Sequence, residues 1–166
     1  MGSLVAGAAR GHYVPPMADP ARRIENLLYL YAERIDAGDL AGVADLFAHG
    51  RIRPGPDAPP EASAEGRDAV LAMYQGATRL YEDGTPQTKH VTTNAIIEVD
   101  EKAGTAASRS YFTVFQKTED LPLQPIIAGR YHDTFQCLDG EWWFDTRIML
   151  VDLPGDLSHH LLFELT

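Results

Sequence analysis

The feature that most constrains the fold of this chain is a series of long predicted strands in its second half. Over residues 88–99, more apolar and more polar side chains alternate, which is the period of a strand whose two faces differ. β-Branched and aromatic residues are frequent over 105–117, and strands over 126–138 and 142–151 are joined by Asp139-Gly140, a strong hairpin signal. Strict alternation in the first strand puts five side chains on its more polar face: His90, Thr92, Asn94, Ile96 and Glu98. The sequence therefore predicts a curved antiparallel sheet.

The first half of the chain has the period of helices. Asp19 followed by Pro20 is typical of a helix N-cap with proline at the first helical position, and the apolar stripe that follows ends near Gly38. Asp39 can cap a second helix, and helical spacing returns after Gly66. Helices followed by a sheet predict an α+β domain in which the helices pack on the concave face of the sheet. Such an arrangement commonly leaves a pocket between the two layers.

Two polar residues of these elements are candidates for chemistry. Asp36 falls in the last turn of the first helix, where the negative end of the helix dipole raises the proton affinity of a carboxylate. That position suits a general base, and the alternative is that Asp36 only caps the turn before Asp39. His90 also has two interpretations. Either its strand face is in water and His90 is a surface histidine, or the face lines a pocket where polar groups orient a ligand.

Composition limits the function classes. The 166 residues, 45% of them hydrophobic, suffice for the core of one domain, which we expect over 19–153 between a flexible arm (1–18) and a tail (154–166) that could cover a sheet edge or a cavity mouth. The net charge of -10 argues against nucleic acid and membrane partners, so we expect a small-molecule or protein partner. One cysteine, Cys137, and the lack of a long apolar stretch predict a cytoplasmic protein.

Four segments, taken together and in register, resemble the SnoaL-like branch of the NTF2-like superfamily. They are Tyr-Ala-Glu-Arg-Ile-Asp at 31–36, His-Val-Thr-Thr-Asn at 90–94, Gly-Arg-Tyr-His-Asp at 129–133, and Asp-Gly-Glu-Trp-Trp-Phe-Asp-Thr-Arg at 139–147. The resemblance covers about residues 21–151. It implies a cone-shaped α+β barrel with its pocket between the helices and the concave sheet, and a homodimer or homotrimer built on the outer sheet face.

Within that superfamily the site pattern is similar to that of hexachlorocyclohexane dehydrochlorinase, bile-acid dehydratase and scytalone dehydratase, which are cofactor-free lyases. The resemblance implies that His90 is a base oriented by Asp36. It also implies that Tyr31 or Arg147 steadies a leaving group or an oxyanion. The residues expected to contact the substrate are Phe112, Val114, Ile127, Tyr131, Asn94 and Tyr74, although Tyr74 could instead belong to the helix core.

The chain departs from this pattern, because the further catalytic aspartate of bile-acid dehydratase falls at Val114 and the place of the dehydrochlorinase lysine is taken by Tyr31. The dyad still predicts proton abstraction from a mainly apolar, cyclic or polyketide-like molecule, with loss of water as the simplest outcome. An isomerase or cyclase would use the same base, and a noncatalytic binder or an assembly subunit are further alternatives. Neither Tyr131-His132-Asp133 nor His159-His160 has a known metal-ligand spacing, so we expect no metal and no other cofactor.

Overall fold

The computed structural model describes residues 19–163, so the predicted arm at 1–18 and the last three residues of the predicted tail lie outside the described residues. The elements follow one another in the order that the sequence patterns predict, helices first and long strands second. They are α1 (Pro20–Asp36), α2 (Leu40–Asp45), β1 (Arg51–Arg53), the 3-10 helix η1 (Pro60–Ala62), β2 (Ala64–Glu65), α3 (Gly66–Ala77), β3 (Thr88–Asp100), β4 (Thr105–Gln116), β5 (Gln124–Leu138) and β6 (Glu141–Pro154).

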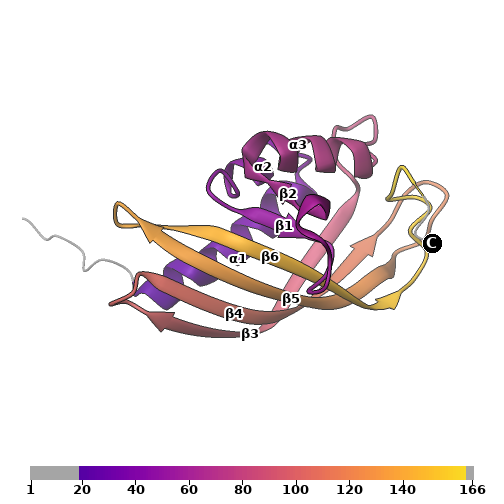
Figure 1. The fold of residues 1–166 in the computed structure, drawn as a ribbon. Coiled ribbons are helices and arrows are strands. Elements are labelled where there is room, and N and C mark those ends of the chain that lie inside the picture. Colours follow the sequence, from indigo (N-terminus) through magenta and orange to yellow (C-terminus); the bar gives the residue numbers. More distant parts are fainter. Residues whose placement is uncertain (1–18, 164–166) are drawn as a thin grey trace, which may run out of the picture.

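The strands form one six-stranded sheet in the order β2-β1-β6-β5-β4-β3. The sheet is curved and does not close, and the helices pack against it (Figure 1). The predicted α+β fold with helices on a curved sheet is therefore confirmed. The four long strands of the second half pair antiparallel, as predicted, and β1 adds a parallel pairing with β6 that was not predicted. A parallel pair needs a crossover connection that local patterns do not reveal.

Helix α1 carries the residues that face the sheet. The side chain of Asp19 accepts a hydrogen bond from the backbone N–H of Ala21, and Pro20 occupies the first turn, as predicted. The buried face of the helix holds Ile24, Leu28, Tyr31, Ala32 and Ile35. Gly38 follows the helix with φ +75° and lies so close to the backbone of Gly84 that a Cβ would be 1.9 Å from the carbonyl oxygen there. The chain turns sharply here, and α1 ends with Asp36 directed at β3.

The alternation predicted for β3 is interrupted by a β-bulge. The register between β3 and β4 shifts between Thr93 and Ile96, and Asn94 adopts φ +55°, in the left-handed region that asparagine tolerates. One extra residue exchanges the two faces of a strand. His90 is therefore on the inner face, whereas Asn94 and Ile96 are exposed on the outer one. The prediction that all three share a face is wrong.

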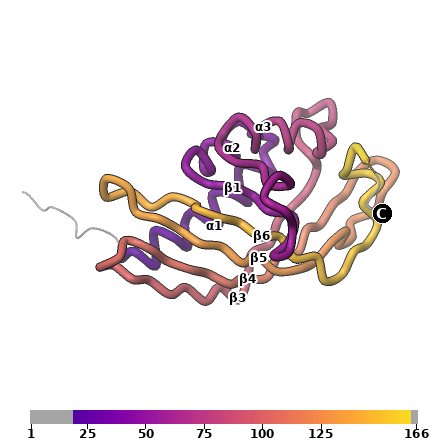
Figure 2. The backbone as a smooth tube through the Cα atoms, in the orientation of Figure 1, coloured from indigo at the N-terminus to yellow at the C-terminus, as the bar shows by residue number. Residues whose placement is uncertain are grey.

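The described part of the tail is fixed to the rest of the domain. Strand β6 runs past its predicted end to Pro154, and the backbone N–H of Gly155 then donates to the carbonyl of Ile126. Residues 155–163 turn back toward the segment after α3, where Leu161 forms a bridge with Thr78. Figure 2 shows this segment, in yellow, beside the ends of β4 and β5.

Candidate functional site

A mainly apolar cavity of about 450 Å³ lies between the helices, the concave face of the sheet and the tail. Its volume falls in the range of small-molecule sites. Residues from α1, α3, four long strands and the tail line it. The lining includes seven residues that the sequence singled out: Tyr31, Tyr74, His90, Phe112, Val114, Ile127 and Tyr131.

Asp36 contacts His90, which lines this cavity, although Asp36 itself is not among the lining residues. Oδ1 of Asp36 lies 2.6 Å from Nδ1 of His90, and Oδ2 accepts a hydrogen bond of 2.8 Å from the backbone N–H of His90. The hydroxyl of Thr88 donates to Oδ1 over 2.8 Å. Both side chains of the pair are only 8% exposed. Three hydrogen bonds hold the carboxylate, so it can fix the orientation of the imidazole ring.

The charge state of the pair follows from these contacts. Burial alone would raise the pKa of Asp36, but the hydrogen bonds and the charge of His90 outweigh burial and lower that pKa below its ordinary value. The pKa of Asp36 therefore shifts in the direction opposite to the rise expected from its place at the end of the helix. An ionised Asp36 accepts a hydrogen bond from the Nδ1–H of His90. Nε2 of His90 is then the ring nitrogen with a free lone pair.

Two tyrosine hydroxyls form a second polar point in the cavity. The hydroxyls of Tyr31 and Tyr74 are 2.7 Å apart, and both side chains are buried. Burial, and then the neighbouring Tyr31, raise the pKa of Tyr74 well above its ordinary value, so Tyr74 keeps its proton. One hydroxyl donates its hydrogen bond to the other. The second hydroxyl can then donate a hydrogen bond to a ligand. The ring of Tyr31 also lies edge-on to His90, with 6.4 Å between ring centroids.

Arg147 lies behind these tyrosines and is not among the residues that line the cavity. Its guanidinium donates two hydrogen bonds, of 2.9 and 2.8 Å, to the carboxylate of Asp133, and both side chains are fully buried. The guanidinium lies 4.2 Å from the ring centroid of Tyr31 and 4.0 Å from that of Tyr131. Burial would lower the pKa of Arg147, but Asp133 more than compensates and raises it. Arg147 therefore supports the cavity wall as a buried cation.

Asn94 is the one predicted substrate contact that the structure places elsewhere. It is exposed at the bulge and borders a hollow on the outer sheet face together with Tyr111, Arg130 and His132. The bulge is the physical reason, because it turns Asn94 away from the face that carries His90.

The tail supplies cavity residues that sequence reasoning did not assign to the site. Leu157, His160, Leu161 and Phe163 all line the cavity. The apolar run at 161–163 indicated a cover for a sheet edge or a cavity mouth, but His160 was considered only as a metal ligand. No local pattern could place its ring in the same cavity as His90, because the two residues are 70 positions apart.

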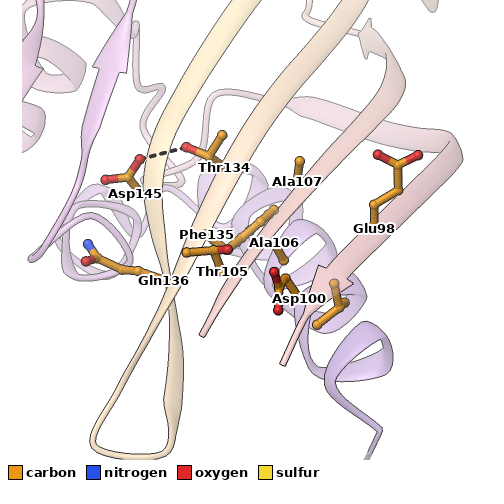
Figure 3. A pocket seen from close by; sticks show the side chains of 10 residues that line it. Glu98, Asp100, Thr105, Ala106, Ala107, Thr134, Phe135, Gln136 and Asp145 are labelled. Atoms are coloured by element: carbon orange, nitrogen blue, oxygen red, sulfur yellow. Dashed lines mark hydrogen bonds between the residues drawn. The ribbon is translucent and has the colours of Figure 1, made fainter. Parts of the chain in front are cut away.

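A second hollow of about 650 Å³ lies at the other end of the sheet. Figure 3 shows Glu98 and Asp145 at opposite sides of this hollow, with Asp145 accepting a hydrogen bond from Thr134. The acidic side chains do not converge. Within residues 19–163, no group of three or more His, Cys, Asp or Glu residues is arranged to hold a metal ion. In the same part of the chain, no helix is both long and apolar enough to cross a membrane.

Comparison with known proteins gives a family and a set of folds. A family model described as a SnoaL-like domain matches residues 18–148. A candidate scytalone dehydratase from Novosphingobium aromaticivorans is similar at 25% identity and a TM-score of 0.63, over 81% of this chain and 85% of that one. An NTF2-like protein with a cystatin-like fold from the same organism has 20% identity and a TM-score of 0.63, over 83% and 84% of the two chains.

A third solved structure is the beta subunit of a candidate aromatic-ring-hydroxylating dioxygenase from Novosphingobium aromaticivorans. It has 18% identity and a TM-score of 0.62, over 80% of this chain and 89% of that one. No curated protein matches the sequence.

Proposed function

The chain belongs to the SnoaL-like domain family, and from that premise we propose that it is a cofactor-free lyase of the dehydratase type. Its substrate is a mainly apolar, cyclic or polyketide-like small molecule. The observation that carries the proposal is the Asp36–His90 pair at the wall of an apolar cavity. A similarity to a candidate scytalone dehydratase at 25% identity supports the same reaction class.

The mechanism begins with proton transfer to His90. Nε2 takes a proton from a carbon next to a carbonyl group, and the ionised Asp36 stabilises the imidazolium that forms. The electron pair of the broken C–H bond forms a carbon–carbon double bond, and the neighbouring C–O bond breaks. The departing hydroxide takes the proton back from the imidazolium and leaves as water, so that His90 is again neutral. A hydroxyl of the Tyr31–Tyr74 pair donates a hydrogen bond to the enolate oxygen during the reaction.

The cavity lining supports the proposed substrate class. Apolar side chains such as Met73, Ile127 and Met149 surround a few polar groups. A ligand of this cavity gains free energy mainly by burying apolar surface, and its oxygen atoms must meet the dyad or the tyrosine pair. A flat, partly oxygenated ring system fits those requirements.

The alternatives differ in how they use the cavity. An isomerase or cyclase would use the same base without losing water, and only the product distinguishes it from a lyase. An assembly subunit would have a filled cone, so an open cavity of about 450 Å³ counts against that reading. A noncatalytic binder would hold its ligand without exchanging a proton with it.

The predicted homodimer or homotrimer and the cytoplasmic location belong to the same proposal. Ile96 and Tyr111 are more than half exposed on the outer sheet face, where a second copy could cover them. Size-exclusion chromatography with light scattering measures the assembly, and a strictly monomeric protein would contradict this part of the proposal.

The test of the function is a screen of hydroxy-carbonyl and polyketide-like compounds in deuterated water against the wild type and His90→Ala. We expect the wild type to release water from one of them, and the recovered substrate to carry deuterium at the carbon that loses its proton, because the proton transfer to His90 can reverse before the C–O bond breaks. Loss of the general base should lower turnover by about 10²-fold to 10⁴-fold in His90→Ala.

The matched control is His132→Ala, since His132 is a strand histidine on the outer face. It should retain wild-type turnover. Turnover that survives unchanged in His90→Ala would refute the mechanism, and a bound ligand that never exchanges its protons would favour the noncatalytic binder.

A further inference from the structure

The cavity holds a second histidine, His160, that comes from the tail. Its backbone is fixed on both sides: its N–H donates to the carbonyl of Leu157, and its carbonyl accepts a hydrogen bond of 2.8 Å from the N–H of Arg79. The neighbouring Leu161 bridges to Thr78. The ring of His160 is thus presented to the cavity by a segment that backbone hydrogen bonds join to the rest of the domain.

One ring nitrogen of the half-buried His160 lacks a polar partner. Nδ1 is buried without a hydrogen-bond partner within residues 19–163. Most of the surrounding lining is apolar, including Leu157, Leu161 and Ile127. An unpaired buried polar atom costs free energy in the empty protein, and in native structures such an atom calls for an explanation. A ligand with an oxygen atom near His160 would supply the missing partner.

The surroundings of His160 keep its ring neutral. Burial, and then the charge that His90 carries when protonated, lower the pKa of His160, Asp36 opposes them, and the resulting pKa is about 4. His160 therefore stays a neutral imidazole with one N–H donor and one acceptor while His90 takes up and returns a proton.

Strand β4, which pairs with β3, has no polar side chain at the position opposite His90. In the register of β3 and β4, His90 is paired with Val114, which is buried, lines the cavity and offers no hydrogen bond. The position on β4 opposite the base therefore supplies no proton donor.

We propose that His160 donates a hydrogen bond from its neutral ring to the oxygen that leaves the substrate. This inference rests on the proposed lyase function and deepens it, because it requires a substrate that carries a hydroxyl group within reach of both histidines. The C–O bond breaks while the N–H of His160 stabilises the departing hydroxide. That hydroxide takes its proton from the imidazolium of His90, so His160 ends the reaction neutral and unchanged.

The test compares His160→Leu, which keeps the volume but has no hydrogen bond, with His160→Gln, which keeps an N–H donor. The control is His159→Leu, since His159 belongs to the same segment but does not line the cavity. The probe is 3-hydroxy-1-tetralone, an apolar β-hydroxy ketone whose dehydration gives fluorescent 1-naphthol. We expect kcat to fall about 10-fold to 100-fold in His160→Leu, the effect of one hydrogen bond to a developing charge. His160→Gln should recover part of this loss, and His159→Leu should match the wild type.

A second measurement separates the two histidines. In deuterated water, recovered probe from His160→Leu should contain more deuterium per product formed than probe from the wild type, because proton abstraction persists while C–O cleavage slows. An unchanged kcat in His160→Leu, with turnover lost in His90→Ala, would overturn the role of His160 and leave the proposed function standing. The role is also overturned if the probe, added to protein with ¹⁵N-labelled histidines, leaves the ring resonances of His160 unmoved.

Discussion

Replacement of Arg147 by methionine is expected to weaken the fold itself, because it leaves Asp133 as a buried carboxylate without its partner. Both side chains are fully buried, and two hydrogen bonds of 2.9 and 2.8 Å join them. Removal of one member of such a pair costs about 3–5 kcal/mol, since the remaining charge is neither solvated nor paired. A domain of this size unfolds with a free energy of about 5–15 kcal/mol, so a large share of the stability would be lost.

The paired replacement Arg147→Met with Asp133→Leu should recover most of that loss. No charge is then left in the interior, and the thioether can pack where the guanidinium now lies 4.0 Å from the ring centroid of Tyr131. Exchange of a buried ion pair for well-packed apolar side chains is often neutral or stabilising. The two substitutions should therefore be strongly non-additive.

Urea unfolding followed by circular dichroism and by tryptophan fluorescence gives the free energy of unfolding for each variant. A heat scan should show the melting temperature of Arg147→Met lowered by roughly 6–20 °C, at about 2–4 °C for each kcal/mol. The control is the exposed pair of Arg130 with Asp152, which has the same two-bond geometry at the surface. Arg130→Met should change stability little, because water solvates the remaining charge.

Two results would refute this reasoning. One is an Arg147→Met variant that unfolds within about 1 kcal/mol of the wild type, well below the range expected for a broken buried pair. The other is a double variant that is no more stable than Arg147→Met. Either result would mean that the buried pair of Arg147 with Asp133 does not stabilise the fold in this way.

Three further predictions concern the site and its wall. The lowered pKa of Asp36 stabilises the fold at pH values above the ordinary pKa of an aspartate, about 3.9. This stabilisation is lost as the pH falls through the folded-state pKa. In urea unfolding, the difference in unfolding free energy between wild type and Asp36→Asn should therefore shrink below about pH 4. Tyr31→Phe should cost about 1–3 kcal/mol because it leaves the hydroxyl of Tyr74 buried without its partner, and in a double-mutant cycle Tyr74→Phe should add little to that loss. Gly129→Ala should destabilise the fold by about 1–3 kcal/mol, since its Cβ would lie 2.1 Å from the carbonyl oxygen of Leu150, whereas Gly55→Ala, with open space around it, should be well tolerated in the same melting assay.

The local elements were predictable because short-range contacts decide them. The start of α1 follows from Asp19 and Pro20, and the hairpin between β5 and β6 follows from Asp139-Gly140, where both residues adopt positive φ. In each case the residues that cause the structure are neighbours in the chain. The parallel pairing of β1 with β6 was missed because its partners are nearly a hundred residues apart and β1 has only three residues.

The candidate site likewise contains residues that the sequence could place and residues that it could not. Its members on regular elements, such as Tyr31, His90 and Tyr131, were found by resemblance and line the cavity. Asn94 was assigned to the same cavity and lies outside it, because one inserted residue in β3 reverses the faces of the strand. Nothing in the alternation of side chains announces where such a bulge falls, since its position depends on the pairing with β4.

By itself, the sequence determined the order of helices and strands, the α+β class and a set of residues suited to proton transfer, because capping, turn and periodicity signals act within a few residues. Only the tertiary structure decided what those residues meet. It joins Asp36 to His90, which lowers the pKa of the carboxyl group against the expected effect of the helix dipole. It also brings His160 from the tail into the cavity. The physical reason is that charge, burial and hydrogen-bond partners at a site come from segments far apart in the chain, and packing alone sets their distances.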